Sequence, residues 1–405
     1  MREILYISYD GMTDPLGQSQ VLPYLQYLSK KGYRFTLLSF EKNSRFKKEK
    51  HLIERITKAA EIDWQPLLFT QRPPIISKIY DRWRLRQAVL KLYNKKKFDL
   101  IHCRSYLAAE MGLELKQKYG VKFLFDMRGF WADEKVDNGQ WKTENLLYRK
   151  IYAYYKTKEK EFLEQADGII SLTEAAKREL LHQEPYKYLQ INVIPCCADL
   201  NHFNYLSVSR MQTENLKEQI GIGRDKKVIT YLGSVGGWYM TQEMFSFYAR
   251  LFIQFPEFVL LVLTKDDPDL VKKEAATLGI PPDKITVLYA RRNELPHYIS
   301  ISDCSIFFIR PTYSKIASSP TKHAELMGMG IPIICNDIGD TGDIIRSTNT
   351  GIVVNEFNNA EYDRAIRKIK DLLSIPKKEI REAATEIFDL EKGAAQYLQV
   401  YERVL

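Results

Sequence analysis

The chain has 405 residues, 45% hydrophobic and 27% charged, which is typical of a folded globular protein and excludes disorder as its main state. Its net charge of +9 suits phosphorylated substrates, anionic lipid or nucleic acid without choosing among them. The five cysteines form no CxxC pair, which disfavours a zinc site or a disulfide framework and fits a reducing cytoplasm. No stretch has the length of a membrane-spanning helix, and Met1–Ser8 is interpreted as a first strand and not a signal peptide.

Short β-rich runs alternate with helical patterns along the whole chain. In the first half the predicted strands are Glu3–Ser8, Phe35–Phe40, Leu100–Cys103, Lys122–Asp126, Gly168–Leu172 and Asn192–Pro195. In the second half they are Val228–Leu232, Val259–Leu263, Ile285–Leu288, Cys304–Ile309, Ile331–Cys335 and Gly351–Val354. This alternation predicts an α/β fold of two Rossmann-like, doubly wound domains that face each other across a cleft.

The periodic pattern is interrupted between residues 195 and 224, and we place a hinge at about residue 200. The expected domains are residues 1–200 and residues 201–383. The last segment, residues 384–405, is predicted to be a single helix that the second sheet does not need. In open α/β sheets ligands bind at the carboxyl ends of the strands, so the informative residues should follow strands directly.

The first such segment, residues 9–20, contains two glycines and two aspartates and leads into a helix predicted from Gln18 to Lys31. Glycines next to a helix amino end allow a phosphate to approach the backbone closely. A long turn between strand and helix explains the segment equally well.

The second segment, Tyr231–Met240, follows the first strand of the second half and precedes a helix predicted to begin near Thr241. Its three glycines are expected to leave backbone N–H groups free to cradle oxyanions. A glycine-rich turn is common at this position of a domain, so the segment indicates a phosphate site without proving one.

The third segment, residues 310–332, carries the strongest signal. Ser319 is predicted to cap a helix that has Pro320 at its first position. Thr321 and Lys322 then occupy the first turn. A lysine there opposes the helix dipole, so its placement makes most sense if a diphosphate binds at this end.

Glu325 lies about one turn deeper than Lys322, where a carboxylate can accept hydrogen bonds from ribose hydroxyls. The alternative is a surface helix on which the two residues form a weak ion pair, worth about 0.3–0.5 kcal/mol. That alternative does not explain why Arg310 and Lys315 also crowd around this helix.

Taken together, these segments resemble the bacterial family 4 glycosyltransferases, which are retaining enzymes with the GT-B fold. The most specific stretch is Ser319–Pro332, which is similar to the family's donor-binding helix. Residues 194–200 resemble its interdomain linker, although Cys196 and Cys197 replace the usual residues. The resemblance implies that the final helix crosses back onto the first domain.

The resemblance also implies roles for the residues of the second domain. Glu325 would hold the donor ribose, while Lys322 and the N–H groups near Thr321 would hold the diphosphate. Arg292 would lie near the base or the diphosphate. The other expected donor-binding residues are Gly17, Gln18, Gly233, Ser234, Lys265, Arg291 and Ser319.

Two departures from the family pattern stand out. Many members carry two glutamates separated by seven residues, and Ala317 occupies the earlier position here. The lysine that often follows the glycine-rich turn is replaced by Tyr239 and Met240, so Lys265 or Arg310 would have to supply the positive charge.

On the acceptor side, polar residues follow two strands of the first half. Arg104, Arg128 and Trp131 are expected to face the acceptor. The alternatives are a core histidine at position 102, an internal ion pair between Asp126 and Arg128, and a core tryptophan at position 131. The catalytic candidates are Lys322, Arg310, Asp126 and His102.

The predicted function is retaining transfer of a hexose from a nucleotide diphosphate sugar to a hydroxyl acceptor, in bacterial cell-surface polysaccharide or glycolipid synthesis. Neither a metal nor a further cofactor is expected. The acceptor is a saccharide or a lipid-linked molecule, and nucleic acid is disfavoured because the positive charge is dispersed. The alternatives are a nucleotide-sugar epimerase of the same fold and a non-catalytic subunit that binds a nucleotide sugar.

Residues 76–97 hold eight Lys or Arg and one Asp, interleaved with Ile79, Tyr80, Trp83, Leu92 and Tyr93. Such a helix can rest on anionic lipid, which predicts a cytoplasmic protein bound peripherally to the inner face of the cell membrane. The alternative is a solvated helix whose apolar stripe packs in the core.

Overall fold

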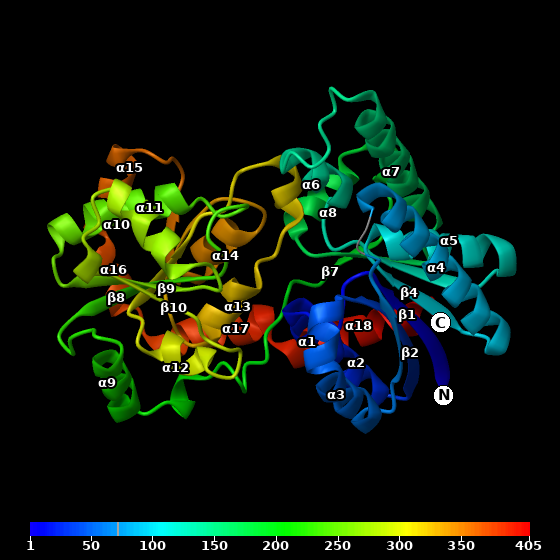
Figure 1. The fold of residues 1–405 in the computed structure, drawn as a ribbon, viewed down its shortest axis with the longest axis horizontal. Coiled ribbons are helices and arrows are strands. Elements are labelled where there is room, and N and C mark those ends of the chain that lie inside the picture. The colour runs from blue at the N-terminus through cyan, green and yellow to red at the C-terminus, as the bar shows by residue number, and fades with distance from the viewer. Residues whose placement is uncertain (71–72) are drawn as a thin grey trace. The chain divides into compact units, whose positions relative to one another are not determined.

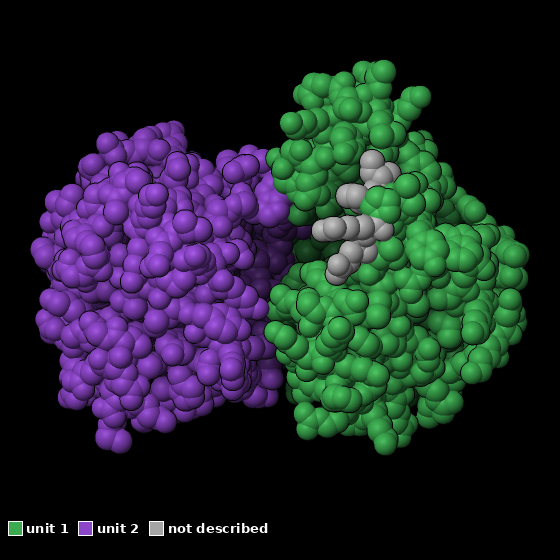
Figure 2. Space-filling view, viewed as in Figure 1, with its two compact units in different colours: residues 1–195, 390–405 green, residues 196–389 purple. Residues whose placement is uncertain are grey.

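The computed structural model of the chain describes residues 1–70 and 73–405, which divide into two compact units (Figure 2). Unit 1 comprises Met1–Pro195 and Leu390–Leu405, and unit 2 comprises Cys196–Asp389. Each unit has its own parallel sheet with helices packed on it (Figure 1). The prediction of two Rossmann-like α/β domains is confirmed.

Unit 1 has a seven-stranded sheet in the order β3-β2-β1-β4-β5-β6-β7, in which every neighbouring pair is parallel. Its strands are β1 (Arg2–Ser8), β2 (Tyr33–Glu41), β3 (Asp63–Leu68), β4 (Leu100–Arg104), β5 (Lys122–Asp126), β6 (Gly168–Ser171) and β7 (Ile191–Val193). Six of these were predicted. The exception, β3, is an edge strand that is only half-buried and contains Pro66, so neither a continuous apolar run nor a clean alternation marks it.

The helices of unit 1 pack on this sheet, with α5 against β4 and β5 and α2 against β2 and α18. They are α1 (Pro15–Gln20), α2 (Leu22–Ser29), α3 (Asn43–Ala59), α4 (Pro74–Lys95), α5 (Tyr106–Tyr119), α6 (Trp131–Asp137), α7 (Leu146–Gln165), α8 (Glu174–Leu181) and α18 (Leu390–Val404).

The single helix predicted from Gln18 to Lys31 is wrong, because the structure has α1 and α2 with a break at Val21 (φ −128°, ψ −65°). Pro23 lies in the first turn of α2 and has no N–H to donate to a preceding turn. The chain therefore starts a new helix at this point.

Unit 2 has a six-stranded parallel sheet in the order β10-β9-β8-β11-β12-β13. Its strands are β8 (Lys227–Leu232), β9 (Phe258–Leu263), β10 (Ile285–Leu288), β11 (Cys304–Phe307), β12 (Ile333–Asn336) and β13 (Gly351–Val354). Its helices are α9 (Arg210–Gln219), α10 (Thr241–Gln254), α11 (Pro268–Thr277), α12 (Leu295–Ser300), α13 (Thr321–Gly328), α14 (Thr341–Thr348), α15 (Asn359–Arg367), α16 (Ile369–Ser374) and α17 (Lys377–Phe388).

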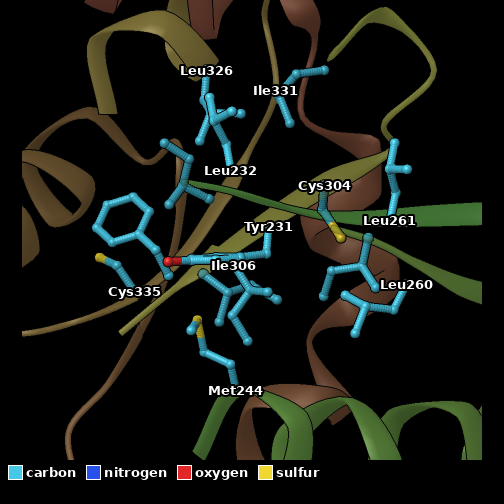
Figure 3. Close-up of a cluster of buried hydrophobic side chains, with 14 of the residues drawn as sticks. Tyr231, Leu232, Met244, Leu260, Leu261, Cys304, Ile306, Leu326, Ile331 and Cys335 are labelled. Atoms are coloured by element: carbon cyan, nitrogen blue, oxygen red, sulfur yellow. The ribbon is translucent and has the colours of Figure 1, made fainter. Parts of the chain in front are cut away.

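The core of unit 2 explains why its strands are continuous apolar runs. All six residues of β9 are buried, because helices cover both faces of a parallel sheet. Figure 3 shows part of this cluster, in which Leu326 of α13 joins Leu232 of β8 and Ile306 of β11. α13 is thereby fixed on the sheet by its apolar side.

The final segment is two helices and not the single helix predicted from Ala384. α17 ends at Phe388, and the extended backbone of Asp389 (φ −65°, ψ 129°) separates it from α18. Ala198 N donates to Phe388 O at 2.9 Å, and Ala198 forms a parallel bridge with Asp389. The two stretches of chain that connect the units are therefore hydrogen-bonded to each other, and α18 packs within unit 1.

In both sheets the strand order reverses beside the first strand, between β1 and β4 in unit 1 and between β8 and β11 in unit 2. Ligands of open α/β sheets bind outside the carboxyl ends of the strands at such switch points. Throughout residues 1–70 and 73–405, no helix has the length and apolarity needed to cross a membrane.

Candidate functional site

The amino end of α13 is the expected diphosphate position. Pro320, with extended backbone (φ −74°, ψ 123°), is the N-cap, and no side chain caps this end of the described helix. The prediction that Ser319 caps the helix is wrong, because Ser319 Oγ accepts a hydrogen bond from Cys196 N at 3.1 Å. Thr321 is the first helical residue, so the first turn remains suited to an anion.

Lys322, the second residue of α13, points into the protein. It is 6% exposed, and its Nζ lies 3.4 Å from the ring centroid of Tyr239 and 4.5 Å from that of Tyr231. Within the described residues Nζ has no hydrogen-bond partner. Burial lowers the pKa of Lys322 well below its usual value, and Glu325 only partly opposes this. An anion beside Nζ would supply the partner that the fold leaves out.

Glu325, one turn further along α13, is 7% exposed. Its Oε1 accepts a hydrogen bond from Arg292 Nη1 at 3.2 Å. The alternative of a surface ion pair between Lys322 and Glu325 is therefore wrong, since both residues are buried and the carboxylate pairs with Arg292. Burial raises the pKa of Glu325, while Arg292 and, more weakly, Lys322 lower it.

The glycine-rich turn after β8 differs from the expected cradle of free N–H groups. The N–H groups of Gly233, Val235 and Gly236 donate to Leu263 O, Asp266 Oδ2 and Thr241 Oγ1 at 2.9, 2.5 and 2.7 Å. Gly233 (φ 128°) contributes space instead, because a Cβ there would lie 2.6 Å from Lys322 Nζ. The Ser234 carbonyl accepts a hydrogen bond from the Tyr231 hydroxyl, and the Ser234 side chain is exposed.

Further positive side chains surround this turn. Arg310 follows β11, its side chain is exposed, and its N–H donates to Trp238 O at 2.9 Å. Lys315 is buried with Nζ 3.7 Å from the Trp238 ring centroid. Lys265 and Arg291 are exposed on the segments after β9 and β10, the former with Nζ 5.8 Å from the Tyr289 ring centroid. Arg310 and Lys315 therefore both contact Trp238, which belongs to this turn.

In unit 1, a buried carboxylate accepts hydrogen bonds from the loop after β1. Glu41, at the end of β2, accepts hydrogen bonds from Met12 N at 2.8 Å, from Thr13 N at 3.0 Å and from Thr13 Oγ1 at 2.6 Å. These two N–H groups of the loop are therefore occupied by the protein itself. Gly17 is buried, and a Cβ on it would lie 2.2 Å from Gly11 O. Gln18 Nε2 reaches Thr13 O at 3.5 Å.

His102 and Asp126 lie in the core beneath α18. The two ring nitrogens of His102 lie 2.7 Å from the Tyr401 hydroxyl and 3.5 Å from Asp126 Oδ2. The Tyr397 hydroxyl also donates to Asp126 Oδ2, at 3.0 Å. Burial lowers the pKa of His102, whereas Arg128 and His102 hold the pKa of Asp126 below its usual value despite its burial. These contacts join α18 to the sheet, and a catalytic role for either residue stays a prediction.

The residues expected on the acceptor side lie at the carboxyl ends of β4 and β5. Arg104 is buried, with Nε 3.3 Å from Asp10 Oδ2. Arg128 has a left-handed backbone (φ 58°), and its Nη1 lies 3.8 Å from Asp126 Oδ1, so the proposed internal ion pair is present. Trp131, half-buried at the start of α6, packs with its ring centroid 4.9 Å from that of Tyr155.

The aromatic surroundings of Lys322 were missed at the sequence level. Tyr231 and Phe307 lie in strands, where an aromatic residue signals only a core position, and Tyr239 occupies a place where the family often has lysine. Phe307 is the most distant of these rings, with its centroid 5.9 Å from Lys322 Nζ. In residues 1–70 and 73–405, no cluster of three or more His, Cys, Asp or Glu could hold a metal ion.

Comparison with known families agrees with this geometry. The sequence model described as Glycosyltransferase Family 4 matches residues 19–202, and that described as Glycosyl transferases group 1 matches residues 212–386. Two Rossmann-like domains of this kind define the GT-B class of fold. The chain belongs to the family 4 glycosyltransferases.

Individual relatives are distant. The D-inositol 3-phosphate glycosyltransferase of Rhodococcus jostii is 20% identical over 280 residues, which are 67% of this chain but only 58% of the relative's length. The structure is similar to sucrose-phosphate synthase from Thermosynechococcus elongatus, with a TM-score of 0.72, 17% identity, and coverage of 100% of this chain and 99% of that one. Anabaena HepE in complex with UDP-glucose gives a TM-score of 0.70 at 13% identity, with coverage of 99% and 100%. At these identities the likeness concerns the fold.

Proposed function

We propose that the chain transfers a hexose from a nucleotide diphosphate sugar to a hydroxyl acceptor, with retention of anomeric configuration. The observation that carries the proposal is the buried amine of Lys322, which lies without a hydrogen-bond partner in the described structure at the uncapped end of α13. A cation held in this way is costly in the empty protein, and a bound diphosphate relieves that cost. The presence of UDP-glucose in HepE, which has the same fold, supports a donor of this class.

Each donor group has a matching position in unit 2. Lys322 and the first-turn N–H groups near Thr321 bind the diphosphate, and Gly233 leaves room for it. Glu325, fixed by Arg292, accepts hydrogen bonds from the ribose hydroxyls. The exposed side chains of Lys265, Arg291 and Arg310 add positive charge around the donor.

For the chemical step, the acceptor hydroxyl attacks from the face that the diphosphate leaves, and a leaving phosphate oxygen takes the hydroxyl proton. The protein orients both substrates and stabilises charge on the departing diphosphate. A helix end contributes at most about 2 kcal/mol, whereas enzymes lower barriers by about 8–23 kcal/mol. Lys322, the other cations and exclusion of water must therefore supply most of the stabilisation.

A thermal-shift panel of nucleotide sugars tests the donor site on the whole chain. A donor at 100 times its dissociation constant should stabilise the protein by about 2.7 kcal/mol. Lys322→Ala should reduce turnover by about 100-fold or more, as does loss of one oxyanion-binding donor elsewhere. Glu325→Ala should weaken donor binding, and Lys370→Ala, an exposed lysine of α16, is the matched control. Full donor binding and turnover in both site variants would overturn the proposal.

Turnover of the donor, measured with and without an acceptor, separates the alternatives. An epimerase of this fold turns over its nucleotide sugar without any acceptor. A non-catalytic subunit binds the donor and releases nothing. The transferase requires the acceptor for rapid turnover. The non-catalytic alternative is tested because Ala317 occupies the position of the family's first glutamate.

We also propose that α4 rests on an anionic membrane surface, which suits a lipid-linked acceptor in cell-surface polysaccharide or glycolipid synthesis. Ile79 and Trp83 are 65% and 53% exposed, and Ile76 and Tyr80 share their side of the helix. The alternative of a core-packed stripe holds only for the later part of α4, whose buried residues include Leu85, Val89 and Tyr93. Exposed apolar and aromatic side chains flanked by basic ones favour an anionic bilayer interface.

Flotation with phosphatidylglycerol vesicles tests this surface. The chain should float with these vesicles, less so with phosphatidylcholine alone, and the Ile79→Ser, Trp83→Ser double variant should remain in solution. Leu206→Ser, which removes an even more exposed apolar side chain from unit 2, is the control. Equal flotation of the double variant and the wild type would contradict the proposal.

A further inference from the structure

A second charged cluster lies in unit 1, at the carboxyl ends of β1, β4 and β5. Arg104 is 4% exposed, and its Nη1 carries no hydrogen bond within the described part of the chain. Its Nε meets the carboxylate of Asp10, which is half-exposed on the loop after β1. A buried guanidinium with one unused donor is costly, because desolvation of an unpaired polar group is not compensated.

Backbone strain gathers at the same place. Ser105 (φ 68°), directly after Arg104, and Arg128 (φ 58°) both have positive φ angles, and Gly129 has φ 123°. Non-glycine residues in this region cost of order 1–3 kcal/mol and cluster where a chain must present groups to a ligand. Here the strained residues adjoin or include the two arginines.

Lys135 and Trp131, both on α6, also belong to this cluster. Lys135 lies on α6 with Nζ 5.5 Å from the ring centroid of Trp131, and burial lowers the pKa of Lys135. Three carboxylates lie near these cations: Asp126 is engaged by Tyr397 and His102, Glu134 acts on Lys135, and Asp10 is half-exposed beside Arg104. The cations Arg104, Arg128 and Lys135 lie beside the half-buried indole ring of Trp131, which suits the face of a sugar.

We propose that this end of the unit 1 sheet binds a phosphoryl group of the acceptor through Arg104 and Arg128, and that Asp10 occupies Arg104 when the site is empty. That the phosphorylated molecule is an acceptor rests on the proposed function. The anion site itself rests on the buried donor, the strained backbone and the position at the switch point between β1 and β4. Arginine suits this role because its planar fork matches phosphate geometry.

Calorimetric titration of the whole chain with glucose 6-phosphate and with geranyl diphosphate tests the site. Arg128→Gln should weaken binding about tenfold or more, which corresponds to loss of a charge-assisted hydrogen bond. Asp10→Asn should tighten binding about two- to fivefold, because it removes the competing carboxylate. Arg86→Gln, an exposed arginine paired with Glu114 in the same unit, should change nothing. Tighter binding of the first ligand indicates a sugar phosphate acceptor, and tighter binding of the second a lipid diphosphate.

Lys322→Ala separates this site from the donor site, because it should leave glucose 6-phosphate binding intact. Unchanged affinity in both Arg128→Gln and Arg104→Lys, with both variants folded by circular dichroism, would overturn the inference. If Arg128→Gln loses phosphate binding but the wild type never turns over a donor, the phosphate site is supported and the proposed function is contradicted. If the wild type transfers sugar and every variant has the same phosphate affinity, only this inference is contradicted.

Discussion

The loops that follow the first strand of each unit look alike in sequence and do different work. Each contains glycines and precedes a helix at the switch point of its sheet. In unit 1 the N–H groups of Met12 and Thr13 donate to Glu41, which is fully buried. In unit 2 three N–H groups of the turn are also bonded within the protein, but Gly233 leaves a space into which Lys322 projects without a hydrogen-bond partner in the described structure. Under the proposed function, the ligand site is marked by an unpaired polar group and not by a glycine-rich loop.

The sharpest test of this contrast is Glu41→Gln. The amide has one hydrogen-bond acceptor fewer than the carboxylate, and its NH2 group would face N–H groups that need acceptors. The free energy of unfolding should therefore fall by roughly 3 kcal/mol. The donor-induced thermal shift of the remaining folded protein should be unchanged. Urea unfolding measures the loss, with the exposed Glu54→Gln of α3 as control. A stable variant with impaired donor binding would give the unit 1 loop the role assigned here to unit 2.

The paired variants Gly17→Ala and Gly233→Ala separate packing from binding. A Cβ at Gly17 meets Gly11 O at 2.2 Å, so this variant should lose roughly 1–3 kcal/mol of stability and keep its donor affinity. A Cβ at Gly233 displaces the Lys322 amine and is strained at φ 128°, so donor affinity should also fall about tenfold. Equal donor affinity in the two variants, measured by calorimetry, would break the comparison.

The smallest expected effect is a gain in stability. Lys322→Met replaces a buried unpaired amine by an apolar side chain of similar length and should raise the free energy of unfolding by roughly 1 kcal/mol. Burial holds the pKa of Lys322 below its unfolded value, so the wild type carries the full cost at low pH, where the lysine is protonated in both states. The advantage of the variant should shrink as pH rises through the folded pKa toward 10.5. Melting curves across that range measure it, and an advantage that grows with pH would contradict the assignment.

Much of the fold could be predicted because its strands are buried on both faces. Runs such as Phe258–Leu263 contain almost nothing but large apolar residues, and only parallel sheets produce that pattern repeatedly. The edge strand β3 escaped because partial burial gives no such run. The breaks at Val21 and Asp389 escaped because each depends on backbone angles at a single residue in an otherwise helical pattern.

The sequence could predict site residues that are neighbours on one helix, but not contacts between different elements. Lys322 and Glu325 are three residues apart on one helix, so their pairing with a helix end could be derived locally. The partner of Glu325 is Arg292, and the rings around Lys322 come from β8, the turn after it and β11. Such contacts depend on strand order, which spacing alone does not give.

The placement of α18 has a consequence for biosynthesis. The first 195 residues form a sheet whose packing includes Tyr397 and Tyr401, yet all of unit 2 is translated before these residues appear. At about 5–20 residues per second, the nascent sheet waits roughly 10–40 seconds with an apolar face uncovered. Unit 2 is contiguous and can finish folding first, so the part of the protein that is made first is completed last. We therefore expect ribosome-bound intermediates truncated before residue 390 to hold a folded second unit and a first unit that is sensitive to protease.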